Sequence, residues 1–352
     1  MPRTLKNIWQ QLTCFENLFL AWRRARENKQ CLPSVLSFKK RLEENLFIIQ
    51  GQLLHKTWLP GAYRGFWVNK PKMRFVQAPP FRDRVVHHAL ANVVLPAFER
   101  RFIPDSFACR VGRGQTNAGL RLTEFLREAI KENDRKGRKT YALKADIHKY
   151  FPHIRHDILK AQIRRTVGDP DVLWLMDRII DESGYEECGL PIGALTSQLY
   201  ANIYLDVFDH YVKDELGIRC YVRYMDDFVI LDSNKRRLHD TQIRLGDILY
   251  ERLRLTYNPK TVIFPAFRGI DFSGYRHWPD YRLPRKRNIK NWRKRFKMMM
   301  KQYAKGRMTV DEVRSRVASF LGYTKHCKAH ETVKSILEEV MFQRKCEYEE
   351  AS

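Results

Sequence analysis

Two adjacent aspartates, Asp226 and Asp227, stand between apolar runs in the segment Tyr-Met-Asp-Asp-Phe-Val-Ile-Leu. The alternation around them predicts a β-hairpin over residues 220–231 that carries both carboxylates at its tip. A third acid, Asp146, ends a short apolar strand predicted over residues 141–146. Neighbouring carboxylates repel each other unless a cation lies between them. The three acids therefore predict a site for two divalent metal ions that catalyses phosphoryl transfer, and the apolar flanks disfavour a solvated Asp-Asp turn.

The elements that must position these acids can be predicted from periodicity. A second hairpin is expected over residues 66–78, with its turn at 69–72, and Asp83 is expected to cap the helix that follows. Short strands are expected around 261–264 and 271–275. Helices are predicted over 4–30, 34–53, 83–97, 156–182, 198–215, 235–253 and 288–305.

Composition narrows the class of partner. The 352 residues include 65 Lys and Arg against 40 Asp and Glu, a net charge of +25, which indicates a polyanion such as nucleic acid. Residues 281–310 contain twelve Lys or Arg and no acid. No apolar run reaches the ~18 residues of a membrane span, so no membrane partner is expected. The start of the chain lacks a signal-peptide core, and seven scattered cysteines indicate a reducing compartment, so a cytoplasmic protein encoded by a bacterium or phage is expected.

The order of motifs resembles the reverse transcriptase family over residues 60–280. A hairpin bearing Lys and Arg is followed by Asp-Ile-x-x-x-Phe, then Leu-Pro-x-Gly, then Tyr-Met-Asp-Asp. The resemblance implies an α+β right-hand polymerase with fingers, a palm built on a split βαβ-type antiparallel sheet, and a helical thumb. It divides the chain into an N-terminal helical extension (1–60), a region that is mainly fingers interleaved with palm (61–140), a region that is mainly palm (141–280) and a helical thumb (281–352).

Roles for individual residues follow from this resemblance. Asp146, Asp226, Asp227 and the carbonyl of Ile147 would hold two Mg²⁺ ions, with Mn²⁺ as a substitute, and Lys260 would protonate the leaving pyrophosphate of a deoxynucleoside triphosphate. Contacts to the incoming nucleotide are expected from Lys70, Lys72, Arg74, Arg84, Phe151, Ile192 and Gln198. Contacts to template and primer are expected from Arg110, Phe272, Gly274, Tyr275, Lys290, Arg293, Lys294 and Lys297.

Several of these assignments have an alternative. Arg84 and Arg110 could instead form structural salt bridges, Phe151 could be a core residue, and Lys260 could be an ordinary surface lysine. In the polymerase reading, Phe151 would exclude a ribose 2′-hydroxyl, which makes DNA the product. On the C-terminal helix, Trp292 is expected to pack inward while the lysines turn towards phosphate.

The fourth motif points to a subfamily. Most reverse transcriptases have glutamine and proline where this chain has Ile192 and Gln198. Both departures resemble the enzymes of diversity-generating retroelements, which implies mutagenic retrohoming: error-prone, adenine-mutagenic cDNA copied from a retroelement template RNA, with a basic oligomeric accessory variability protein as partner. Isoleucine lacks the amide that could hydrogen-bond the new base pair, which weakens discrimination. The alternatives are another bacterial reverse transcriptase (group II intron, retron or phage-defence type), an RNA-dependent RNA polymerase, or an inactive RNA-binding scaffold.

Overall fold

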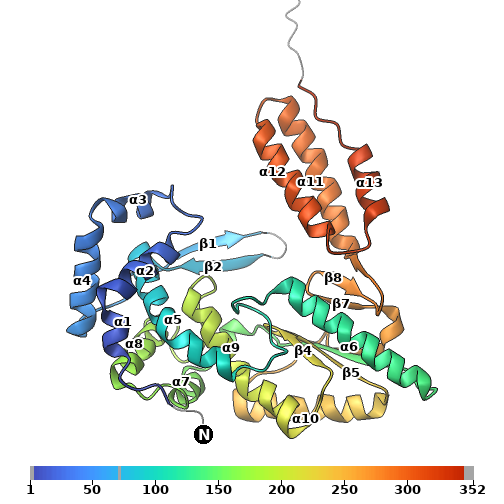
Figure 1. The fold of residues 1–352 in the computed structure, drawn as a ribbon, viewed down its shortest axis with the longest axis horizontal. Coiled ribbons are helices and arrows are strands. Elements are labelled where there is room, and N and C mark those ends of the chain that lie inside the picture. The colour runs from blue at the N-terminus through green and yellow to red at the C-terminus, as the bar shows by residue number, and fades with distance from the viewer. Residues whose placement is uncertain (1–3, 70–72, 345–352) are drawn as a thin grey trace, which may run out of the picture.

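The computed structural model describes residues 4–69 and 73–344. Helices and antiparallel strands are arranged in three regions, with N-terminal helices and a hairpin on one side, a central sheet, and a C-terminal group of helices that stands apart (Figure 1). No helix in the described ranges is long and apolar enough to cross a membrane.

The central sheet has four antiparallel strands in the order β4-β5-β3-β6. Along the chain, β3 is followed by helices, the β4–β5 hairpin, another helix and β6, which is the split βαβ arrangement. The predicted hairpin and strands are confirmed. The strands are β3 (Tyr141–Asp146), β4 (Tyr221–Tyr224), β5 (Asp227–Asp232) and β6 (Val262–Pro265).

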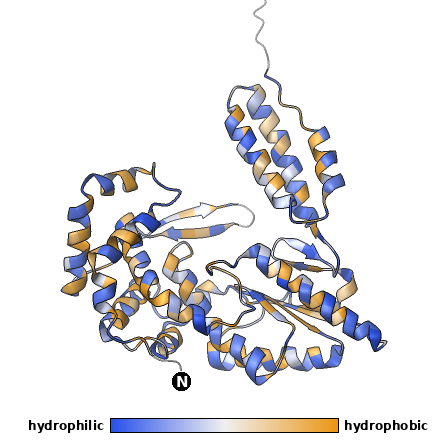
Figure 2. Cartoon of the chain, in the orientation of Figure 1, coloured by the Kyte–Doolittle hydropathy of each residue, from blue (hydrophilic) through white to orange (hydrophobic). Residues whose placement is uncertain are grey.

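The central strands are covered on both faces, because alternate side chains point in opposite directions. On β5, Phe228 packs on Phe208 of one helix, with ring centroids 5.3 Å apart, whereas Val229 joins a separate cluster with Phe125 of another. Figure 2 shows these strands as largely hydrophobic. The covering helices are α6 (Gln115–Arg135), α9 (Leu195–His210) and α10 (Lys235–Leu253).

The N-terminal helices pack around a long buried helix and differ from prediction at their ends. The helix expected over 34–53 is two helices, because Arg41 leaves helical geometry at φ −128°. Asp83 does not cap the following helix, since the Pro79-Pro80 pair starts it at Phe81 and the Asp83 carboxylate instead accepts a hydrogen bond from the Gly61 N–H at 2.7 Å. The helices are α1 (Trp9–Thr13), α2 (Phe15–Ala25), α3 (Pro33–Lys40), α4 (Leu42–Leu54) and α5 (Phe81–Arg101).

Two other predicted helices also differ from prediction. The stretch 156–182 forms α7 (His156–Arg164) and α8 (Pro170–Asp181), because Asp169 and Pro170 start a new helix, with the Asp169 carboxylate accepting from two backbone N–H groups. The stretch 198–215 begins earlier, at the start of α9, and ends in a π-helical turn over Tyr211–Glu215.

The predicted hairpin beside the N-terminal helices is present as β1 (Arg64–Val68) and β2 (Arg74–Ala78). Trp67 and Phe75 pair across it, with ring centroids 5.2 Å apart, yet both are exposed. The turn residues Lys70 and Lys72 lie outside the described residues.

The C-terminal helical unit has its own small core and joins the central region through a separate three-stranded sheet. Phe296, Met299, Phe320 and Ile336 form that core. A capping box at Thr309 starts its middle helix. The linking strands are β7 (Ile270–Phe272), β8 (Tyr275–His277) and β9 (Arg282–Pro284), and the helices are α11 (Lys286–Ala304), α12 (Val310–Thr324) and α13 (His330–Glu338).

Candidate active site

The three predicted acids come together at one end of the central sheet. β3 and β5 pair antiparallel with Asp146 directly opposite Asp227, and directly opposed residues on neighbouring strands have Cα atoms ~4.5–5.5 Å apart. Asp226 occupies the adjoining turn, and its carbonyl accepts a hydrogen bond from the Ile147 N–H at 3.1 Å. Residues 80 positions apart in the chain are thereby fixed as neighbours.

The turn that carries Asp226 is a two-residue hairpin loop. Tyr224 pairs with Asp227, which leaves only Met225 and Asp226 between the strands. Met225 has φ +58°, a left-handed conformation that two-residue hairpin turns require but that a side chain disfavours. Arg223 donates a hydrogen bond from Nη1 to the Met225 carbonyl at 2.9 Å, which holds the turn from within the protein.

The electrostatics of this edge favour a bound cation. Burial raises the pKa of Asp227 to about 6, the Lys144 ammonium opposes that rise, and the Asp146 carboxylate adds to it. Asp227 Oδ1 accepts no hydrogen bond, and Lys144 Nζ lies 3.4 Å away. Carboxylate oxygens are the ligands that Mg²⁺ takes in proteins, so the donor set fits this ion.

The acid side chains point to separate partners. Among residues 4–69 and 73–344, no three His, Cys, Asp or Glu side chains converge closely enough to enclose an ion. Asp227 faces Lys144, whereas Asp146 accepts a hydrogen bond from Asn258 Nδ2 at 3.0 Å. Like charges on neighbouring strands are expected to turn away from each other towards N–H donors in this way.

Asn258 is a site residue that the sequence analysis missed. Besides the side-chain bond, its backbone N–H donates to the Asp146 carbonyl at 2.7 Å, so Asn258 forms two hydrogen bonds to Asp146. Asn258 stands two positions before Lys260, and its Oδ1 accepts from the Lys260 N–H at 3.1 Å. The exposed Lys260 side chain is therefore tied to the Asp146 strand end through Asn258. The Asn-Pro turn was the available sequence signal.

The loop of the fourth motif joins the acid edge to the β1–β2 hairpin. The Leu190 N–H donates to the carbonyl of half-buried Phe151 at 3.0 Å, and the Gln77 N–H of β2 donates to the Ile192 carbonyl at 2.8 Å. Ile192 is half-buried and Gln198 is exposed in the first turn of α9. These two backbone hydrogen bonds hold the segments that carry Phe151 and Ile192 next to each other and to β2.

Three arginines expected at the nucleotide or template differ in their surroundings. Arg74 is exposed at the start of β2, where it can meet a ligand. Arg84 is half-buried, its Nε donates to the Pro79 carbonyl at 3.0 Å, and burial lowers its pKa. Arg110 is buried, pairs with Glu99 at 2.8 Å, and donates to three backbone carbonyls. These contacts are those of the structural salt bridge, the alternative to the expected template contact of Arg110.

The predicted primer-binding turn connects the central region to the C-terminal helical unit. Phe272 is buried and Gly274 has φ +87°; a Cβ there would lie 2.4 Å from Gln115 Nε2. Tyr323 of α12 donates from its hydroxyl to the Gly274 carbonyl at 2.9 Å and stacks on Tyr275 with ring centroids 5.0 Å apart. The turn is therefore clamped from both α6 and α12.

The basic helix α11 divides its side chains much as predicted. Phe296 is buried, Trp292 packs on the core, and the lysines are exposed. Arg293 differs from them, because it pairs with Glu339 and donates to Ser335 Oγ at 3.1 Å. The three lysines expected to contact template and primer, Lys290, Lys294 and Lys297, are all exposed.

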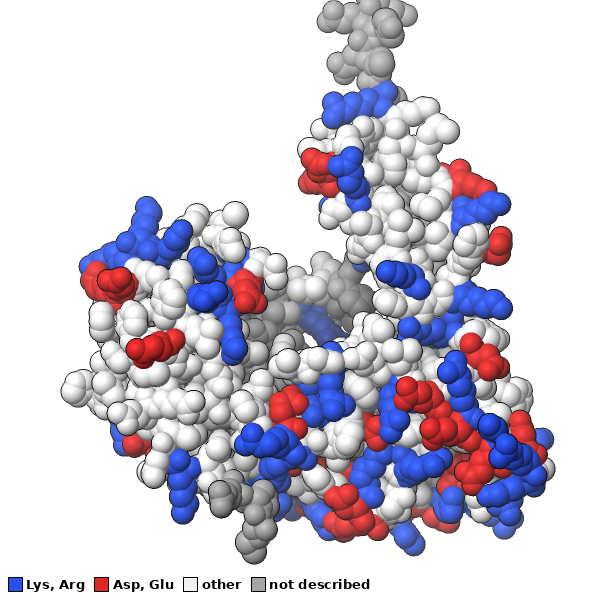
Figure 3. Space-filling model, in the orientation of Figure 1, with Lys and Arg blue, Asp and Glu red and all other residues white. Residues whose placement is uncertain are grey.

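A groove beside α11 offers room for a ligand. Its volume is about 650 Å³, and Lys294, Arg295 and Tyr323 are among its lining residues. Figure 3 shows the molecule hollowed between the C-terminal helical unit and the N-terminal half. A groove with cationic and aromatic side chains is typical of nucleic-acid contacts.

Comparison with known proteins agrees with this geometry. Residues 67–277, more than half of the chain, match the family described as reverse transcriptase (RNA-dependent DNA polymerase). The chain belongs to the reverse transcriptase family. The predicted α+β right-hand polymerase fold is confirmed.

Two curated relatives and one solved structure show how far the similarity extends. Protein YkfC of Escherichia coli (strain K12) is 26% identical over 283 residues, 67% of this chain and 72% of that protein. The putative COX1/OXI3 intron 1 protein of Saccharomyces cerevisiae (strain ATCC 204508 / S288c) is 25% identical over 162 residues, 43% of this chain but only 18% of that protein. The structure of apo telomerase from Candida tropicalis matches with a TM-score of 0.50 at 11% identity, covering 80% of this chain and 57% of the telomerase chain. This last match shows the fold alone.

Proposed function

We propose that this reverse transcriptase copies an RNA template into DNA at the sheet edge where Asp146 opposes Asp227 and Asp226 occupies the adjoining turn. This register is the observation that supports the proposal, because it brings three aspartates to one edge of the sheet, and carboxylates are the groups that hold the ions of a two-metal site. Asp146, Asp226, Asp227 and the Ile147 carbonyl would hold two Mg²⁺ ions, or Mn²⁺ as a substitute. When bound, the ions would lower the pKa of the primer 3′-hydroxyl and balance the charge of the triphosphate.

The chain's own residues complete this proposed site. Arg74, exposed at the start of β2, would grip the triphosphate of the incoming deoxynucleotide, and Arg84 would support it. Phe151 would pack against C2′ of the sugar and exclude a 2′-hydroxyl. Lys260, held near the Asp146 strand end by Asn258, would donate the proton to the leaving pyrophosphate.

Template and primer would lie along the C-terminal helical unit. The β7–β8 turn would hold the primer end, and the exposed lysines of α11 would contact the phosphate backbone without reading sequence. We accordingly assign 1–60 to an N-terminal extension, 61–140 mainly to fingers, 141–280 mainly to palm and 281–352 to the thumb.

We further propose that the enzyme is the mutagenic polymerase of a diversity-generating retroelement. Ile192 and Gln198 support this assignment. The Ile192 loop lies between Phe151 and β2, and an isoleucine there would lack the amide that discriminates between correct and incorrect base pairs. Its partners would then be the retroelement template RNA, the cDNA and a basic accessory protein, in the cytoplasm of a bacterium. The alternative is a group II intron-type enzyme, with which similarity to a protein named for an intron is compatible. A variable near-repeat in the neighbouring DNA, differing at adenines, would favour the first.

The polymerase proposal is tested by Asp226→Ala, with Asp232→Ala as the matched control. Asp232 ends β5, the strand that follows Asp226, at the opposite end of the sheet, where it pairs with Arg237. With an RNA template, a DNA primer, deoxynucleotides and Mg²⁺, Asp226→Ala should reduce primer extension by at least ~1,000-fold while RNA affinity stays near the wild-type value. Asp232→Ala should extend normally. Extension by Asp226→Ala at a rate close to wild type, or none by the wild-type protein, would refute the proposal.

A further inference from the structure

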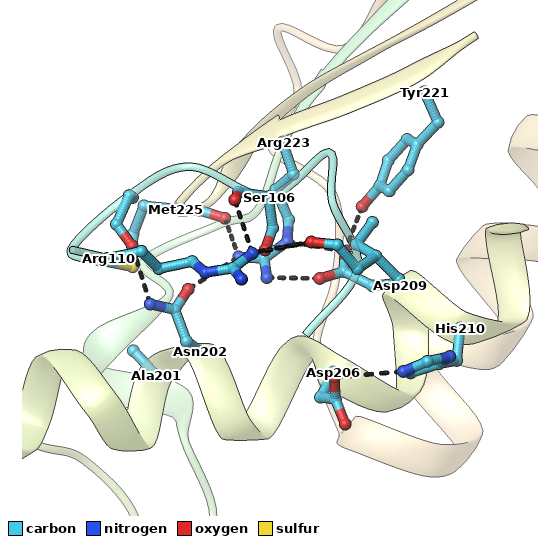
Figure 4. A network of polar contacts seen from close by, with 12 residues as sticks. Ser106, Arg110, Ala201, Asn202, Asp206, Asp209, His210, Tyr221, Arg223 and Met225 are labelled. Carbon is cyan, nitrogen blue, oxygen red and sulfur yellow. Dashed lines mark hydrogen bonds and ion pairs between the residues drawn. The ribbon is translucent and has the colours of Figure 1, made fainter. Parts of the chain in front are cut away.

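Directly behind the acid edge lies a fully buried ion pair, Arg223 of β4 with Asp209 of α9 (Figure 4). Both side chains are inaccessible to solvent. Arg223 Nε donates to Asp209 Oδ1 at 2.7 Å, and Nη2 donates to Oδ2, so the pair is bidentate. Burial alone would lower the pKa of Arg223, but Asp209 outweighs it and raises the pKa, so the guanidinium stays charged.

Such a pair needs an explanation other than stability. Desolvation of two buried charges costs about as much as their attraction returns, and well-packed apolar residues often replace such pairs without loss. Arg223, however, has a donor that Asp209 does not use. Its Nη1 donates to the Met225 carbonyl at 2.9 Å and lies 3.4 Å from Asn202 Oδ1.

The frame around the guanidinium is fixed from several directions. The Arg223 backbone N–H donates to the Asp105 carbonyl at 2.9 Å, and its carbonyl accepts from the Phe107 N–H at 3.1 Å. The Asn202 amide donates to the Ala108 carbonyl at 2.9 Å, which ties α9 to the same segment. Because these bonds fix the Arg223 guanidinium, its remaining N–H donor in turn fixes the group to which it donates.

The remaining donor, Arg223 Nη1, bonds to Met225, the strained residue of the turn that carries Asp226. Met225 has φ +58° with a side chain attached, so the turn needs an external hold at this residue. The other half is held by the Ile147 N–H on the Asp226 carbonyl. The two bonds together fix both residues of the turn, and with them the direction in which the Asp226 carboxylate leaves the backbone.

We propose that Arg223, oriented by Asp209, is a positioning residue that fixes the Met225-Asp226 turn in the conformation that binds the divalent ions. The proposal rests on the proposed polymerase function. Loss of groups that orient metal ligands typically weakens metal affinity ~10–100-fold. The same loss is expected here when the Met225 carbonyl loses its donor, although Arg223 touches neither metal nor substrate.

The test compares Arg223→Lys with Tyr221→Phe. Lysine keeps the charge beside Asp209 but has no planar fork to reach the Met225 carbonyl as well. Tyr221→Phe removes the 2.6 Å bond from the Tyr221 hydroxyl to Asp209 Oδ1 in the same buried network and leaves the turn bond intact. Should Arg223→Lys fail to fold, the double variant Arg223→Gln with Asp209→Asn replaces it, because this variant leaves no buried charge unpaired.

Mn²⁺ affinity is measured by electron paramagnetic resonance on protein bound to template and a dideoxy-terminated primer with the matching nucleotide, so that no turnover occurs. Arg223→Lys, or the double variant, should bind Mn²⁺ ~10–100-fold more weakly. Tyr221→Phe should bind like wild type at equal or lower thermal stability. Wild-type-like Mn²⁺ affinity in the Arg223 variant, or equal weakening in Tyr221→Phe, would overturn the positioning role. A wild-type protein that neither binds Mn²⁺ nor extends primers would instead overturn the proposed function.

Discussion

Replacing Ile192 by glutamine should make the polymerase more accurate opposite template adenine. The Ile192 carbonyl is fixed by the Gln77 N–H at 2.8 Å, and this backbone bond is unaffected by the side chain. The side chain is half-buried, so an amide there can keep contact with water and should not destabilise the loop. The substitution therefore adds a hydrogen-bonding group at a backbone position that stays constant.

The size of the effect follows from a single hydrogen bond. One neutral bond contributes ~1 kcal/mol in net terms, which corresponds to a roughly fivefold change in a ratio of rates. If Ile192 faces the new base pair as proposed, a correct pair would fit the site without the amide, whereas a mispair would benefit from its absence. The error frequency opposite adenine should therefore fall about fivefold, while correct insertion changes by less than twofold.

The assay is single-nucleotide insertion opposite adenine and opposite guanine, reported as kcat/KM for right and wrong nucleotides. Ile192→Met is the matched control, because it keeps the volume and apolar character without the amide. If glutamine and methionine change the adenine error ratio alike, or if both templates lose correct insertion equally, Ile192 is a packing residue. Arg74 would then be the next candidate for the source of infidelity, since it too would cover the incoming base pair.

Three further outcomes are expected. Asn258→Ala removes the side-chain donor to Asp146 and should weaken Mn²⁺ affinity ~10-fold, measured as for the turn variants, with RNA affinity unchanged. Arg110→Ala should lower the free energy of unfolding in urea by about 3 kcal/mol, because it leaves a partly buried carboxylate unpaired, and binding of RNA by the folded protein should not change. The Asp206 carboxylate, 3.5 Å away, raises the pKa of His210 from 6.5 to about 10. The stability it contributes is full below pH 6.5 and is lost as pH rises towards 10, so urea midpoints should fall over this range less in His210→Gln than in wild type.

Local patterns predicted the parts of the fold that local forces determine. The strand over 141–146, the hairpin over 220–231 and the helix over 235–253 all appear within a residue or so of their predicted bounds. Each combines strong periodicity with a clear boundary, such as Asn234, whose side chain caps α10 by accepting from two backbone N–H groups. The antiparallel register that opposes Asp146 to Asp227 follows from these elements once they pair.

Residue type alone was a poor guide where a partner elsewhere in the fold outweighs a local preference. Asp83 has the residue type of a helix cap, but its carboxylate bonds to Gly61, 22 residues away, and the helix starts earlier. Arg110 has the residue type of a phosphate contact, but Glu99 and nearby carbonyls occupy its donors. Asn258 lies 112 residues from Asp146, so no pattern within a window could join them. Residue type indicates which interactions a side chain can make, whereas its partners in the fold determine which of these interactions it makes.

The net charge of +25 also combines side chains with different partners. That surplus indicates a polyanionic partner, yet it counts Arg110 and Arg223, whose charges are neutralised inside the protein. The cations that can meet a phosphate backbone are those with exposed ammonium groups, among them Lys290 and Lys294 of α11. Their contribution to binding should fall with salt, because exposed contacts release counterions, whereas the buried pairs should be insensitive to it. Salt dependence is therefore the measurement that separates arginines and lysines that bind nucleic acid from those that build the site.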